Sequence, residues 1–308
     1  MLISLPAAFS NPVITSALVS AGVTLIIFIL KGTLKPFWEK HFHKYKLKSE
    51  HEYEQRKHIK SALSKYKAPL LDAAESLNHR LWNFSSNCKH GWLIIDPRKT
   101  KQEQYYLYSF CYRFLSFFAL CRKIEKELVY LDSTLSEKND LYFVKYLKLM
   151  KNIFCDASIF KDLDYDVEHA VDHFFKDDML SIVDSLITEN GVISFSEFDK
   201  LGTEKYQSVI NYFSSISKER NCNKWYVLHA FHFVLMAFLS KYGYDYQVTS
   251  KKKLNTLFNA TPKNIITNNL LKIISDMRLD DCKKMKISIK ILTSTHNYTE
   301  QPNKIVSP

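Results

Sequence analysis

The chain has 308 residues, of which 46% are hydrophobic, so it can bury a sizeable core in one large domain or two small ones. Its formal net charge is +11, but residues 31–67 hold eleven Lys/Arg against four Glu, whereas residues 156–199 hold two Lys against twelve Asp/Glu. This local excess argues against nucleic acid as a partner. Six glycines and eight prolines are too few for the frequent turns of a sheet-rich fold, so we predict an all-α protein.

The first predicted element is a membrane-spanning helix over residues 13–31. Eighteen uncharged, mostly apolar residues run from Val13 to Leu30. As a helix they rise about 27 Å, close to the roughly 30 Å thickness of a bilayer's hydrocarbon core. A buried core helix of the same length is the alternative interpretation.

Charge on the two sides of this helix predicts its orientation. Residues 1–12 carry no charged side chain, and the basic side chains follow the apolar run. The positive-inside rule therefore places residues 1–12 outside and the remainder in the cytoplasm. Lys31 and Lys35 occupy the region where a cleaved signal would have small residues, so we expect an uncleaved, single-pass anchor in a bacterial inner (plasma) membrane.

A basic juxtamembrane helix is predicted over residues 32–65. Lys35-Pro36 disfavours an uninterrupted continuation of the preceding helix, because proline lacks the helical donor. Trp38, Phe42 and Tyr45 recur at helical spacing, so one face could lie among lipid headgroups. We expect residues 31–67 to contact the bilayer and its anionic headgroups. A solvated connector helix is the alternative.

An α-helical cytoplasmic domain is predicted over residues 66–250. Its first helix has a clear apolar stripe, including Leu70, Ala73, Leu77 and Leu81, and Pro69 is placed at its start. Beyond residue 250 we expect a basic, partly disordered tail over 251–308, with a strand near residues 286–292. The other predicted helices cover residues 102–132, 139–155, 168–189, 203–218 and 224–242.

One sequence motif resembles a family of uncharacterised bacterial helical proteins. The motif reads Tyr66-x-x-Pro69-Leu70-Leu71-x-Ala73-Ala74-x-x-Leu77-x-x-Arg80-Leu81-x-Asn83. The resemblance implies a helical cytoplasmic domain and a bacterial origin, and it brings no activity or cofactor. Within the motif, we expect Arg80 to pair with Glu125 or Glu127, because a buried charge needs a partner.

The sequence contains no phosphate loop, nucleophile elbow, or kinase or metalloprotease motif, so we expect no cofactor and favour a non-enzymatic role. His169 and His173 stand four residues apart, which would put two imidazoles on one helical face, and they are weak metal candidates. His229 and His232 lie in an apolar segment and should be neutral and hydrogen-bonded. Six cysteines without a CxxC pair indicate scattered thiols.

These features predict a membrane-tethered helical module for interaction or sensing, with protein partners or a homo-oligomer as its assembly. The alternative is a membrane-perturbing bacterial defence effector, for example against phage. Ser16, Ser20 and Thr24 form a small-residue stripe that would let such helices pack together. A membrane-bound metalloenzyme using the histidine pairs is the third hypothesis.

Overall fold

The computed structural model describes residues 12–129, 135–166, 168, 172–216, 222–259 and 264–296. These residues are helical apart from turns, loops and one isolated β-bridge, so the predicted all-α fold is confirmed. The chain divides into two compact units, Met1–Lys57 and His58–Pro308.

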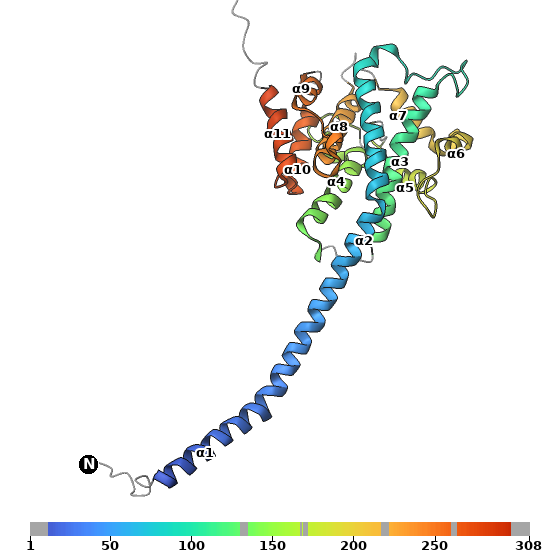
Figure 1. The fold of residues 1–308 in the computed structure, drawn as a ribbon. Coiled ribbons are helices and arrows are strands. Elements are labelled where there is room, and N and C mark those ends of the chain that lie inside the picture. Colours follow the sequence, from blue (N-terminus) through green and yellow to red (C-terminus); the bar gives the residue numbers. More distant parts are fainter. Residues whose placement is uncertain are drawn as a thin grey trace, which may run out of the picture. The chain divides into compact units, whose positions relative to one another are not determined.

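The first unit begins with α1 (Pro12–Ile29), followed by the π-helical segment η2 (Leu30–Leu34) and the start of α2 (Lys35–Asn87) (Figure 1). The wider π-turn directly precedes Lys35-Pro36, where proline has no backbone N–H to donate in a regular α-helix, and the chain stays helical through it. Residues 12–32 have a mean hydropathy of 2.5, and α1 has no buried residue. The helix is therefore long and apolar enough to span a membrane, and it does not form part of a core in this structure.

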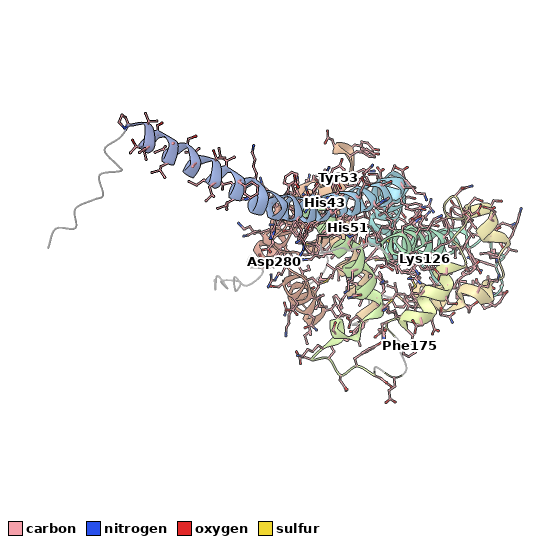
Figure 2. All side chains as sticks on the ribbon, turned by 90° about the horizontal axis from the view of Figure 1, so that it is seen from below. His43, His51, Tyr53, Lys126, Phe175 and Asp280 are labelled. Carbon is pink, nitrogen blue, oxygen red and sulfur yellow. The ribbon has the colours of Figure 1, made fainter. Side chains whose placement is uncertain are left out.

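The part of α2 that belongs to this unit is a polar, exposed helix. Trp38, Phe42 and Tyr45 are 70%, 67% and 71% exposed, and His43 and His51 are also exposed (Figure 2). Ion pairs one helical turn apart, such as Lys46 with Glu50, run along its surface and each contributes only a few tenths of a kcal/mol.

In the second unit, α2 continues with a buried stripe that includes Leu70, Leu77 and Leu81, as predicted. Placing Pro69 at a helix start is wrong, because α2 passes through it without ending. The remaining elements are η3 (Cys88–His90), α3 (Tyr105–Leu128), α4 (Lys138–Cys155), η5 (Ala157–Phe160), α5 (Lys176–Asp184), α6 (Phe195–Lys200), η6 (Thr203–Tyr206), α7 (Gln207–Ser214), α8 (Asn223–Tyr242), η7 (Asp245–Gln247), α9 (Lys251–Asn259), α10 (Ile265–Asp276) and α11 (Lys283–His296).

The core of this unit is a cluster of aromatic rings around α3. Phe114 is fully buried, and its ring centroid lies 4.9 Å from those of Phe118, Phe154 and Phe213. Helix α8 is buried along most of its length and contacts α4, α10 and α11. The apolar run of α8 is therefore accounted for by packing within the protein.

Two segments differ from their predicted structure. The helix expected over 168–189 is present only as α5, and residues 172–175 before it are irregular. The strand predicted near 286–292 is wrong, because α11 covers it. Ile287, Ile289 and Ile291 alternate as in a strand, but the buried positions are Met285, Ser288, Ile291 and Leu292, which follow helical spacing.

Residues 251–259 and 264–296, assigned to the tail by the sequence, contribute to the core of the second unit. Helices α10 and α11 both contact α8, and α9 contacts α11. Leu254, Leu270 and Ile274 are buried there. Residues 260–263 and 297–308 of the predicted, partly disordered tail lie outside the described residues.

Candidate functional site

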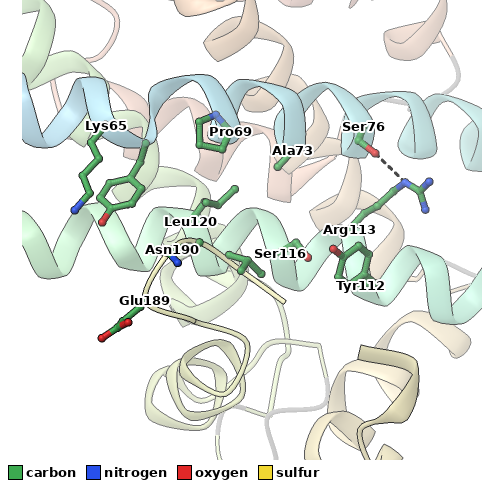
Figure 3. Close-up of a pocket in the computed structure, with 13 residues that line it drawn as sticks. Lys65, Pro69, Ala73, Ser76, Tyr112, Arg113, Ser116, Leu120, Glu189 and Asn190 are labelled. Carbon is green, nitrogen blue, oxygen red and sulfur yellow. Dashed lines mark hydrogen bonds between the residues drawn. The ribbon is translucent and has the colours of Figure 1, made fainter. Parts of the chain in front are cut away.

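A cavity of about 490 Å³ lies between α2, α3 and the turn formed by residues 187–192 (Figure 3). Lys65 lies at one end of it, and Arg113 reaches toward Ser76 at the other. The lining residues are Lys65, Tyr66, Pro69, Ala73, Ser76, Tyr112, Arg113, Ser116, Leu120, Glu189, Asn190, Gly191 and Val192. The cavity therefore combines an apolar middle with polar ends.

The 187–192 turn and the residue that follows it are held against α3 by hydrogen bonds from two side chains. The Lys123 ammonium donates to the carbonyls of Thr188 at 2.6 Å and Glu189 at 2.7 Å, and the Tyr112 hydroxyl donates to the carbonyl of Ile193 at 2.9 Å. Lys123 is itself buried. Charge-assisted bonds of this kind are among the stronger ones in proteins, so this wall of the cavity is built into the fold. Asn190 and Gly191 lie at its tip, beyond the end of α5 at Asp184.

Two partly buried arginines meet at the Ser109 hydroxyl. Arg113 donates from Nε to Ser76 Oγ at 2.9 Å and from Nη1 to the Ser109 carbonyl at 3.2 Å, and Nη1 also bonds Ser109 Oγ. Arg80 donates from Nη2 to the same oxygen at 2.9 Å. In the part of the chain that the structure describes, neither arginine forms an ion pair with a carboxylate. Two positive charges are thus held close together without a negative partner.

The predicted ion pair of Arg80 with Glu125 or Glu127 is wrong. Glu127 accepts hydrogen bonds from Lys65 and Tyr66, and Glu125 pairs with Lys151. These carboxylates are closer to other basic groups, so Arg80 finds only neutral acceptors.

Tyr106 connects the motif residues Arg80 and Asn83. The Arg80 guanidinium carbon lies 4.4 Å from the centroid of the Tyr106 ring, and the Tyr106 hydroxyl donates to Asn83 Oδ1 at 2.8 Å. Burial lowers the pKa of Arg80, and the nearby positive charge of Arg113 adds to this effect. The motif thus joins α2 to α3 and supports the arginine pair.

Ser116 presents a buried polar group to the same cavity. The residue is 8% exposed, and its hydroxyl has no hydrogen-bond partner among the described residues. Leaving such a group unpaired costs about 1–3 kcal/mol.

Pro69, which belongs to the same motif as Arg80 and Asn83, also lines the cavity. It lies one helical turn after Lys65. The Lys65 carbonyl therefore lacks its usual N–H donor, because proline has no backbone N–H.

Sequence reasoning missed the roles of Ser76, Ser109, Arg113 and Ser116. One signal was present in the sequence: no acidic residue stands three or four positions from either Arg80 or Arg113. On a helix those are the positions where a pairing carboxylate would lie.

His229 and His232 are buried and hydrogen-bonded, as predicted. His229 Nδ1 lies 2.8 Å from the Trp225 carbonyl oxygen, and His232 Nε2 lies 2.9 Å from Asn78 Oδ1. Burial holds the pKa of His232 well below its ordinary value, with a smaller effect from His229. Both therefore help to join helices in the core.

Acidification should destabilise the protein through His232. Below about pH 6.5 the unfolded chain gains a proton on this imidazole that the folded chain does not, so the free energy of unfolding falls by about 1.4 kcal/mol per pH unit until the folded-state pKa is reached. Urea unfolding of the wild type and of His232→Gln between pH 7.5 and 5 measures this slope. The variant should show a smaller loss, and equal slopes would contradict the assignment.

The metal candidates His169 and His173 are not placed together on a helix. His169 lies outside the described residues, and His173 lies in the irregular segment before α5, where its Nδ1 is 2.6 Å from the Tyr165 hydroxyl. Burial lowers the pKa of His173. No group of three or more His, Cys, Asp or Glu side chains among the described residues is arranged to hold a metal ion. The six cysteines are free thiols, three of them buried.

The small-residue stripe lies on α1, where no side chain is buried. The Ser16 hydroxyl donates to the Val13 carbonyl at 3.4 Å, and the Thr24 hydroxyl donates to the Ser20 carbonyl at 2.8 Å. These two hydroxyls therefore have acceptors within their own helix and do not require a second helix.

Comparison of the chain with protein-family models, curated proteins and solved structures finds no match. Any functional assignment therefore depends on the apolar helix α1 and on the cavity with its arginine pair.

Proposed function

We propose that the chain is a single-pass protein of the bacterial inner membrane, whose helical unit lies in the cytoplasm and serves for interaction or sensing. The observation that carries this proposal is the contrast between two apolar helices. Helix α8 buries its apolar side chains in the core, whereas α1 buries none. An exposed helix of this hydropathy would be unfavourable in water and favourable in a bilayer.

The basic side chains that follow α1 support the proposed orientation. Residues 31–67 carry eleven Lys/Arg against four Glu. Each lysine or arginine near an anionic surface contributes about 1 kcal/mol of attraction, so this segment favours the cytoplasmic leaflet. The exposed rings of Trp38, Phe42 and Tyr45 suit the headgroup region of the same leaflet.

The second unit supports a role in sensing or interaction. It contains a cavity with a preformed wall. Buried clefts with a few convergent polar groups are the usual sites for small ligands.

Deleting residues 1–31 tests the tether. We expect the full chain to float with membranes in a sucrose gradient and to resist sodium carbonate extraction, and the deletion variant to remain in the soluble fraction. A chain in which residues 13–30 are all leucine is the matched control and should still float, because length and apolarity carry the anchoring. Flotation of the deletion variant would contradict the proposal, and aggregated protein is recognised because it sediments without floating.

A further inference from the structure

We propose that the cavity between α2, α3 and the 187–192 turn binds a small organic oxyanion, a phosphate or carboxylate on an apolar body, with its charge at the Arg113 end. This inference gives a ligand class to the proposed sensing function and rests on that function for its biological role. The binding itself depends only on the second unit.

The charges at the two ends of the cavity determine where the anion lies. Lys65, at one end, is already neutralised by Glu127 at 3.1 Å. Glu189 and Asn190 lie toward that same end, away from Arg113 (Figure 3). At the opposite end, Arg113 and Arg80 share Ser109 Oγ, and their hydrogen-bond acceptors among the described residues are all neutral. An oxyanion is therefore favoured at the arginine end and opposed at the other.

The arginine pair lowers the stability of the fold, because no carboxylate among the described residues neutralises the two charges. Two like charges that share one hydroxyl repel each other, and partial burial strengthens that repulsion. Ser76, Ser109 and the Tyr106 ring fix the guanidinium groups in position. Arginine side chains held in this way are suited to bind phosphate or carboxylate, since the planar guanidinium matches the geometry of these groups.

The middle of the cavity defines the rest of the ligand. Tyr66, Ala73 and Leu120 provide apolar walls, while the unpaired Ser116 hydroxyl is the one buried polar side-chain atom in the lining that lacks a partner among the described residues. A ligand with an apolar body and one hydrogen-bonding group would fill this space. The volume of about 490 Å³ lies within the usual range for small-molecule sites, which favours a small molecule over a protein segment.

Titration calorimetry of the full chain in a nonionic detergent tests the site with three probes. Phenyl phosphate combines an oxyanion with an apolar ring, inorganic phosphate has the anion alone, and benzyl alcohol has the ring alone. We expect one phenyl phosphate per chain, with binding about tenfold tighter than either of the other two probes. Benzoate should bind at the same site if the carboxylate fits as well.

Variants locate the binding. Arg113→Gln should weaken phenyl phosphate about tenfold or more, because a charge-assisted interaction is lost, whereas Arg113→Lys should retain part of the affinity. Arg98→Gln is the matched control, since Arg98 is an exposed arginine paired with Asp96, and it should change nothing. Ala73→Leu leaves the arginines in place and fills the middle of the cavity, so it should weaken phenyl phosphate and spare inorganic phosphate.

The outcomes distinguish a free small molecule from a phospholipid headgroup as the source of the anion. They also test the oxyanion site separately from the membrane tether. Tighter binding of water-soluble dihexanoyl phosphatidic acid than of phenyl phosphate would identify a phospholipid headgroup as the occupant and support the oxyanion site. Failure of both phenyl phosphate and benzoate to bind at millimolar concentration would overturn the site. Folded Arg113→Gln and Ala73→Leu variants that bind phenyl phosphate as tightly as the wild type would also overturn it. Membrane flotation is measured separately, so either proposal can fail without the other.

Discussion

Replacing Phe114 with alanine is expected to lower the free energy of unfolding of the helical unit by about 3–5 kcal/mol. The Phe114 ring is fully buried, and its contacts with Phe118, Phe154 and Phe213 join α3 to α4 and α7. Truncation removes apolar burial and leaves a cavity that the surrounding helices can close only in part. Natural domains have only about 5–15 kcal/mol of stability, so this loss is large.

Urea unfolding of the full chain in detergent, followed by the helical circular dichroism signal, measures the effect. Tyr246→Ala is the matched control, because Tyr246 is 72% exposed and its truncation should change stability by less than about 0.5 kcal/mol. A loss below about 1 kcal/mol for Phe114→Ala would mean that the aromatic cluster does not organise the core.

Long helices with many apolar residues could be predicted closely from the sequence. The segments expected over 139–155 and 224–242 correspond to α4, Lys138–Cys155, and α8, Asn223–Tyr242. The spacing of the apolar positions defines α4, whereas α8 is apolar on nearly all sides and is recognised as a helix by its length. The same reasoning located the buried stripe of α2.

Predictions failed where tertiary packing outweighs a local signal. Proline usually marks a helix start, but α2 passes through Pro69 because the stripe on both sides of it, from Ile59 to Leu81, is anchored in one core. The alternating isoleucines of α11 suggested a strand, but burial against α8 and α9 uses the helical positions instead. Local pattern is thus a weaker guide than the surface on which a segment packs.

The candidate site was outside the reach of pattern reasoning because its contacts join distant positions. Arg113 bonds Ser76, which is 37 residues away, and Lys123 bonds the Thr188 carbonyl, 65 residues away. Neither contact follows from helical spacing. The motif residues Arg80 and Asn83 could be noticed from the sequence, but their common partner Tyr106 could not.

The proposed membrane topology is tested most directly by fusing two reporters, in separate chains, after Pro308. Alkaline phosphatase becomes active only outside the bacterial cytoplasm, whereas green fluorescent protein requires the cytoplasm when a chain is exported unfolded. Each reporter on a chain lacking residues 1–31 is the control for a cytoplasmic position. The positive-inside rule and the basic residues 31–67 predict which reporter works.

We predict that the fluorescent fusion of the full chain is bright and floats with membranes, while the phosphatase fusion is no more active than its deletion control. Active phosphatase on the full chain would place the helical unit outside the cytoplasm and contradict the orientation. A fluorescent fusion of the full chain that remains in the soluble fraction would contradict the membrane tether itself.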